Sequence, residues 1–128
     1  MKGYITNIEK ATLENTDYRR VLYTSKSSQL VLMNIKPGDE IGEEVHDLDQ
    51  FIRIEQGSAQ VILDDVSHDV QDDDAIVIPQ GTNHNVINTG DIDLKLYSVY
   101  SPPEHKDGTV HKTKADDKEE HFDGKTTE

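Results

Sequence analysis

The stretch that decides the fold reads EEVHDLDQFIRIEQG and covers residues 43–57. It places three side chains that can donate an electron pair to a metal, Glu44, His46 and Gln50, just ahead of an apolar alternation. Residues two apart on a strand share a face, so Glu44 and His46 point to the same side, and the parity of the alternation turns Gln50 inward. A lone Glu-x-His before a strand is more often only a solvated turn, so the interpretation depends on the rest of the chain.

The apolar residues are unevenly distributed along the chain. Its 128 residues suffice for one domain with a real core but not for two. Only 33% of them are hydrophobic, and nearly all of the large apolar ones precede residue 101. We therefore expect residues 1–100 to form the folded domain and residues 101–128 a charged, largely flexible tail, which buries too little to offset its ordering entropy. The histidines of this tail are expected to be exposed: His105, His111 and His121.

The charge of the chain restricts its partners. Its 26 acidic and 13 basic residues give a formal net charge of -13, which opposes binding to nucleic acid and to anionic membranes. No apolar run approaches the ~20 residues that cross a bilayer, and MKGYITNIEK at residues 1–10 lacks the apolar stretch of a secretion signal. Without cysteine there are no disulfides or thiolate ligands. We expect a soluble, cytoplasmic protein that binds neither nucleic acid nor membrane.

Apolar residues recur with period two, or in short β-branched runs, in seven segments: 18–24, 29–35, 51–56, 59–63, 75–78, 85–88 and 94–100. Turn sequences such as KPGD, QGS and PQGTN separate these segments. No segment of ten or more residues before Ser101 keeps a convincing helical pattern. The pattern predicts an all-β fold with little or no helix, that is, a sandwich, a jelly roll or a closed barrel.

The segment at 29–35 is apolar on both faces, with Leu32 on one and Met33 on the other. One face fills the interior, and the second needs a cover. We expect this cover to be another copy of the chain across a two-fold axis, giving a homodimer with the N-terminal strand at its interface. The alternative is that loops or the N-terminal strand of the same chain cover the second face.

A second histidine, His84, follows a Pro-x-Gly turn and begins another strand. Together with the first stretch it resembles the two motifs of the cupins, a superfamily of small barrels. The first motif reads Gly38, Glu44, His46, Gln50 and Gly57, and the second reads Asp73, Pro79, Gly81, His84 and Asn88. The resemblance covers roughly residues 28–100 and implies a cupin-type double-stranded β-helix, also called a jelly-roll barrel.

Three positions depart from the family pattern. Glu44 stands where cupins usually have their first histidine, Gln50 where they have a glutamate, and Asp73 where they have a turn glycine. The resemblance implies a divalent transition metal (Mn, Fe, Co, Ni or Zn) held by Glu44, His46, Gln50 and His84. An amide is a weaker donor than imidazole, and the alternative is a polar pocket without metal.

Three hypotheses on function remain open. The first is a metal-dependent enzyme, isomerase-like, acting on a small oxygenated molecule such as a sugar phosphate or a hydroxy-keto acid. The second is an Fe(II) dioxygenase, because Glu44, His46 and His84 have the composition of a two-histidine, one-carboxylate site. The third is a binding or sensing module without turnover. The ending SPPEHKDGTVHKTK resembles that of small bacterial cupins loosely described as sugar-phosphate-isomerase-like. An alternative to an exposed His111 is that this side chain closes over the metal.

Overall fold

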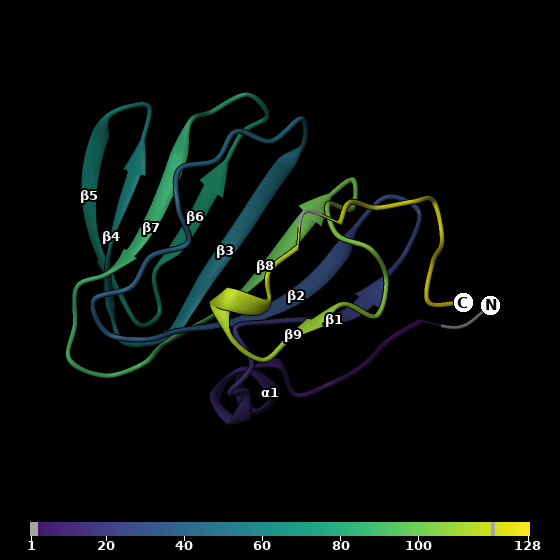
Figure 1. Cartoon of the computed structure of the whole chain (residues 1–128), viewed down its shortest axis with the longest axis horizontal. Helices are drawn as coiled ribbons and strands as arrows, with labels where there is room; N and C mark the ends of the chain where they lie inside the picture. The colour runs from purple at the N-terminus through teal and green to yellow at the C-terminus, as the bar shows by residue number, and fades with distance from the viewer. Residues whose placement is uncertain (1–2, 119) are drawn as a thin grey trace.

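The structure, a computed structural model, describes residues 3–118 and 120–128 (Figure 1). In this range the elements follow one another as α1 (Ile8–Glu14), β1 (Arg19–Thr24), β2 (Gln29–Ile35), β3 (Asp49–Gln56), β4 (Ser58–Leu63), β5 (Val66–Gln71), β6 (Ala75–Ile78), β7 (His84–Asn88), β8 (Leu94–Ser101), β9 (Val110–His111) and the 3-10 helix η1 (Lys114–Asp116). The all-β prediction is confirmed, with α1 and η1 as short exceptions. Across these described residues, no helix has the length and apolar character that a membrane crossing requires.

The strands form two antiparallel sheets. The larger has the order β6-β3-β8-β2-β1-β9 and the smaller the order β5-β4-β7. Figure 1 shows β5, β4 and β7 together at one end of the molecule, with β2, β1 and β9 at the other. Isolated bridges at Glu40–Ile87 and Glu44–His84 attach the long connection between β2 and β3 to β7. This connection is therefore held against the smaller sheet, which positions the first part of the predicted site.

The core lies between the two sheets and follows the period-two alternation. In β3, Ile52 and Ile54 are both 0% exposed while their neighbours are partly exposed. They belong to a core cluster with side chains from six other strands, among them Val31, Met33, Ile35, Val61, Val86, Leu94 and Leu96. Burial of each such side chain stabilises the fold by about 1.5–3 kcal/mol. Gln50 continues the inward face of β3 and is 3% exposed, as the parity predicts.

Helix α1 covers part of the outer face of the larger sheet. Asn7 caps the helix by accepting a hydrogen bond from the backbone amide of Lys10 at 3.1 Å. Leu32 on the outer face of β2 is 2% exposed, and it lines a hollow together with Ala11 of the helix and Leu22 of β1. The same chain thus covers this part of the second face, which was the alternative to a partner copy.

Strand β5 was not among the predicted strands because its alternation is absent. Five of its six residues are exposed, so no apolar stripe marks the strand. It pairs with β4 through a turn in which Asp64 and Asp65 have φ of 46° and 69°, the left-handed conformation that tight hairpins require. Asp73, at the usual glycine position of the next turn, also has a positive φ, 75°, and its amide donates to the Ile54 carbonyl at 2.8 Å.

The segment after residue 101, predicted to be a largely flexible tail, makes specific contacts in the structure. Strand β9 pairs with β1. The buried side-chain amide of Gln29 donates to the His105 carbonyl at 2.7 Å and accepts from the His105 amide at 2.9 Å. His105 and His111 are 9% and 7% exposed, so the prediction that they are exposed is wrong. His105 is held by Gln29 and packs edge-on against the Tyr100 ring, and His111 lies beside Arg19. Such contacts leave no apolar periodicity in the sequence.

Candidate metal centre

Glu44 and His84 lie directly opposite each other in an antiparallel bridge. The amide of Glu44 donates to the carbonyl of His84 at 2.8 Å, and the amide of His84 donates to the carbonyl of Glu44 at 2.9 Å. Opposite residues of such a pair project to one face with their Cβ atoms about 5 Å apart. His46 follows two residues after Glu44 on the same face, and its ring centroid lies 5.1 Å from that of His84. Backbone pairing thus brings the two predicted motifs together.

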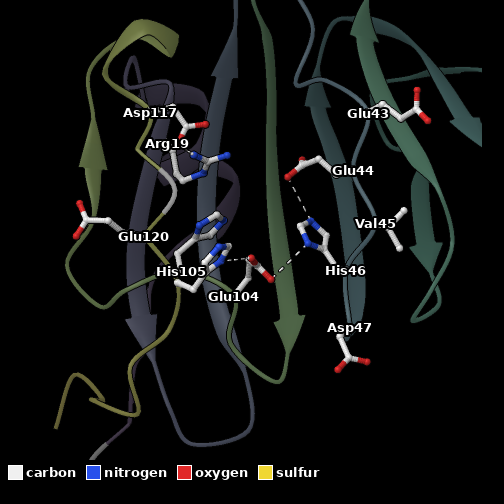
Figure 2. A pocket seen from close by; sticks show the side chains of 11 residues that line it. Arg19, Glu43, Glu44, Val45, His46, Asp47, Glu104, His105, Asp117 and Glu120 are labelled. Carbon is white, nitrogen blue, oxygen red and sulfur yellow. Dashed lines mark hydrogen bonds and ion pairs between the residues drawn. The ribbon is translucent and has the colours of Figure 1, made fainter.

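One donor atom from each of Glu44, His46 and His84 lies within 4.8 Å of the other two. Glu44 Oε2 is 3.6 Å from His46 Nε2, and Figure 2 shows the carboxylate and the imidazole facing each other across the site. Donor atoms bound to a common ion at about 2.1 Å lie roughly 3–4.2 Å apart. The three side chains therefore fit a divalent transition metal after only a small movement.

The two histidines both present Nε2 for this purpose. His84 Nδ1 lies 2.9 Å from the Thr82 carbonyl, which can only accept, so Nδ1 carries the proton and Nε2 is free. His46 Nδ1 lies 3.3 Å from Glu104 Oε2. Burial alone lowers the pKa of His46, but the hydrogen bond with Glu104 and the charge of Glu44 outweigh it, so this pKa is raised. The negative potential that favours a protonated ring also favours a metal cation.

Gln50 has an unusual environment for a buried amide. Its Nε2 donates to Ser98 Oγ at 3.2 Å, whereas its Oε1 is buried and has no hydrogen-bond partner within residues 3–118 and 120–128. An unpaired buried acceptor costs about 1–3 kcal/mol. The free oxygen suits a fourth metal ligand, which stays a prediction for Gln50.

A cavity of about 510 Å³ adjoins the cluster (Figure 2). Six of the described residues that line it are acidic: Glu43, Glu44, Asp47, Glu104, Asp117 and Glu120. Arg19 is the one lysine or arginine among the described lining residues. The wall is therefore strongly negative, and much of it comes from the segment after residue 101.

Arg19 is a buried cation in this wall. Its side chain is 4% exposed, and Nη1 donates to Asp117 Oδ1 at 2.8 Å. His111 Nδ1 lies 3.4 Å from the same Nη1. His111 therefore packs beside Arg19 and is not part of the three-residue cluster, which does not support the hypothesis that it closes over the metal.

Sequence analysis did not identify Arg19, Glu104 or His105 as part of the site. The Glu-His pair at 104–105 was the available signal, but it lies in the segment that was predicted to be a largely flexible tail. Asn88, the last residue of the second motif, holds turn backbone: its Nδ2 donates to the Ile35 and Ile92 carbonyls, and its Oδ1 accepts from the Gly90 amide, each at 2.9 Å.

Comparison with known proteins places this two-sheet architecture in a family. A family model described as "Cupin domain" matches residues 31–100. The chain belongs to the cupin family, and the predicted jelly-roll fold is confirmed.

Two relatives and one solved structure are similar over most of the chain. Protein YrkC of Bacillus subtilis (strain 168) is 49% identical over 122 residues, which span 90% of this chain and 66% of YrkC. Protein L612 of Acanthamoeba polyphaga mimivirus is 46% identical over 112 residues, 84% of this chain and 70% of L612. The crystal structure of BH2720 from Bacillus halodurans superposes with a TM-score of 0.88 at 47% identity and covers 90% of this chain and 92% of that one. None of these names states an activity.

Proposed function

We propose that the protein binds a divalent transition metal (Mn, Fe, Co, Ni or Zn) through Glu44, His46 and His84, with Gln50 as a fourth donor. The loaded protein then acts on a small oxygen-bearing organic molecule in the adjoining cavity. The observation that carries this proposal is the convergence of one carboxylate and two imidazoles within 4.8 Å. The Nδ1 atom of each imidazole faces an acceptor and leaves Nε2 free.

The chemistry follows from this arrangement. A divalent ion held by three or four protein ligands supplies Lewis acidity to a carbonyl or hydroxyl oxygen of the substrate. The side chains around it supply orientation and exclude water. Tyr100, whose ring centroid lies 6.0 Å from that of His46, is buried, and burial raises its pKa, so it stays neutral.

The charge of the cavity favours an uncharged substrate over a sugar phosphate. Six carboxylates outweigh Arg19 and a divalent ion together, so the wall stays net negative. Phosphate recognition ordinarily uses clustered arginine or lysine. A neutral hydroxy-carbonyl compound or sugar meets no such repulsion, and Arg19 lines the same wall.

The first experiment is metal analysis of protein purified without chelator or affinity-tag metal. We expect bound metal in the wild type and its loss in Glu44→Ala and His84→Ala. His68→Ala is the matched control, because His68 is exposed on β5. Retention of the full metal content by both site variants contradicts the proposal. Thermal-shift measurements with neutral sugars and hydroxyketones against their phosphates then test the substrate class.

An Fe(II) dioxygenase is the second candidate. The donor set of Glu44, His46 and His84 is the two-histidine, one-carboxylate combination of non-haem iron oxygenases. Anaerobic loading with Fe(II), followed by measurement of oxygen uptake in the presence of candidate substrates, separates it from the first proposal. If the protein binds metal and ligand but shows no turnover, either with Fe(II) and oxygen or with the other divalent metals, the result instead supports a binding module.

We also propose that the protein is a homodimer. A row of apolar side chains, Val77, Phe51, Val99 and Leu30, runs across the outer face of β6, β3, β8 and β2 through directly paired positions. Val77 is 65% exposed, and no described residue covers it fully. Light scattering should give a dimer mass for the wild type and a smaller mass for Val77→Asp; a wild-type monomer contradicts the proposal.

A further inference from the structure

Glu104 contacts two histidines from different parts of the chain, His46 and His121. Figure 2 shows the carboxylate of Glu104 directed at the ring of His46. Its Oε2 is 3.3 Å from Nδ1 of His46, and its Oε1 is 2.9 Å from Nδ1 of His121. The Glu104 side chain is only 14% exposed, whereas that of His121 is 69% exposed. One carboxylate thus joins the candidate metal centre to the C-terminal segment.

The contact with His46 has a definite chemical consequence. A histidine that binds metal through Nε2 carries its proton on Nδ1, and an acceptor there fixes both the tautomer and the ring plane. His84 uses the Thr82 carbonyl for this purpose. His46 has a carboxylate instead, which makes its imidazole a stronger donor than a carbonyl partner does.

We propose that Glu104 is a positioning residue that holds His46 in its metal-binding orientation and thereby couples the C-terminal segment to the metal centre. The inference rests on the proposed metal site. It adds to that site an outer carboxylate from a part of the chain beyond residues 31–100, where the family model matches.

The backbone beneath Glu104 is held firmly enough for this role. The amides of Glu104 and His105 both donate to Oε1 of Gln29, at 3.3 and 2.9 Å, and Gln29 is 1% exposed in β2. The Glu104 carbonyl accepts from the amide of Phe122 at 2.9 Å, next to a bridge between His105 and His121. These hydrogen bonds fix the backbone from which the Glu104 carboxylate projects.

Coupling of this kind is reciprocal. If the segment raises the affinity of the centre for a metal, the metal stabilises the packed segment by the same factor. Metal loading should therefore slow amide exchange at the Glu104 and Phe122 amides, and this slowing should be lost in Glu104→Ala. A segment that packed independently of the centre would exchange at the same rate with and without metal.

The test is titration of the full chain, freed of metal by chelator, with Co²⁺, whose visible spectrum reports the geometry of its ligands. We expect Glu104→Ala to lower Co²⁺ affinity 10–100-fold and to change the spectrum, and Glu104→Gln to lose less because its amide oxygen still accepts from Nδ1. Glu120→Gln is the matched control. It removes one negative charge from the same cavity, where Glu120 pairs with Lys106 at 3.7 Å, and it should bind Co²⁺ within about threefold of wild type.

The outcomes separate this inference from the proposed function. Wild-type affinity and spectrum in both folded Glu104 variants, together with tight wild-type binding, overturn the inference alone. A loss in Glu120→Gln equal to that in Glu104→Ala also overturns it, because cavity charge would then explain the effect. Absence of Co²⁺ binding by the wild type overturns the metal site itself and this inference with it.

Discussion

His105 should make the stability of the protein depend on pH between neutrality and pH 4. The side chain is 9% exposed and packs edge-on against Tyr100, with ring centroids 5.1 Å apart. Burial, reinforced by the nearby charge of Arg19, lowers the pKa of His105 to about 3. In the unfolded chain the same group titrates near 6.5. Below that pH the unfolded state takes up a proton that the folded state excludes, so stability is lost as pH falls from 6.5 towards 3.

The size of the effect follows from the two pKa values. At pH 5.5 the unfolded group is about ten-elevenths protonated and the folded group neutral, which costs about 1.4 kcal/mol relative to pH 7.5. With an unfolding entropy of about 2.1 cal/mol/K per residue, this corresponds to a fall of roughly 5 °C in Tm for a chain of this length. This loss of stability stays nearly the same as long as the pKa of His105 in the folded state is below about 4.5.

The assay is chemical or thermal unfolding of metal-free protein at pH 7.5, 6.5 and 5.5, for the wild type and for His105→Phe. The variant keeps an aromatic ring against Tyr100 but cannot take up a proton, so its stability should fall less by about 1.4 kcal/mol over this range. His68→Asn, at an exposed position on β5, should follow the wild type. Parallel pH curves for the wild type and His105→Phe would refute the argument that His105 is buried in its neutral form.

Three further predictions concern stability. A chelator should lower the Tm of metal-loaded wild type but not of His84→Ala, as measured by differential scanning fluorimetry; an equal decrease in both would place the metal elsewhere. Asp73→Gly should raise the free energy of unfolding by about 0.5–1 kcal/mol in urea denaturation, because glycine adopts φ of 75° without strain and the exposed ion pair with Arg53 contributes little; destabilisation would contradict this. Asn88→Ala should lower the free energy of unfolding by about 2–4 kcal/mol in the same assay, since it leaves the buried Ile35 carbonyl and the part-buried Ile92 carbonyl without their donor; a loss below 1 kcal/mol would show that water replaces this donor.

Much of the barrel was predictable because its strands are half-buried. Period-two alternation gives each of β1–β4 and β6–β8 a recognisable pattern, and the segments predicted for them match within two residues at either end. Strand β5 was not predicted because five of its six residues are exposed. Helix α1 was not predicted because a seven-residue helix with one fully buried side chain leaves almost no apolar stripe. Burial creates a sequence pattern, and elements that bury little do not carry one.

Some residues of the candidate site could also be predicted from the sequence, and others could not. Motif spacing predicted that Glu44, His46 and His84 lie near the beginnings of strands. Antiparallel pairing of these segments is then enough to bring the three side chains together. Glu104 and Arg19 could not be found in this manner, because their places depend on how the chain after residue 101 returns across β1 and β2.

The sequence by itself thus determined the barrel, the direction of Gln50 and the identity of the candidate metal ligands. Only the tertiary structure decided that a polar, charged segment closes one wall of the cavity and supplies a carboxylate to His46. The physical reason is that hydrophobic periodicity is a local signal, repeated along a strand, whereas this wall is held by single hydrogen bonds and ion pairs between residues far apart in the chain. Contacts of this kind depend on the folded geometry and leave no pattern in a local stretch of sequence.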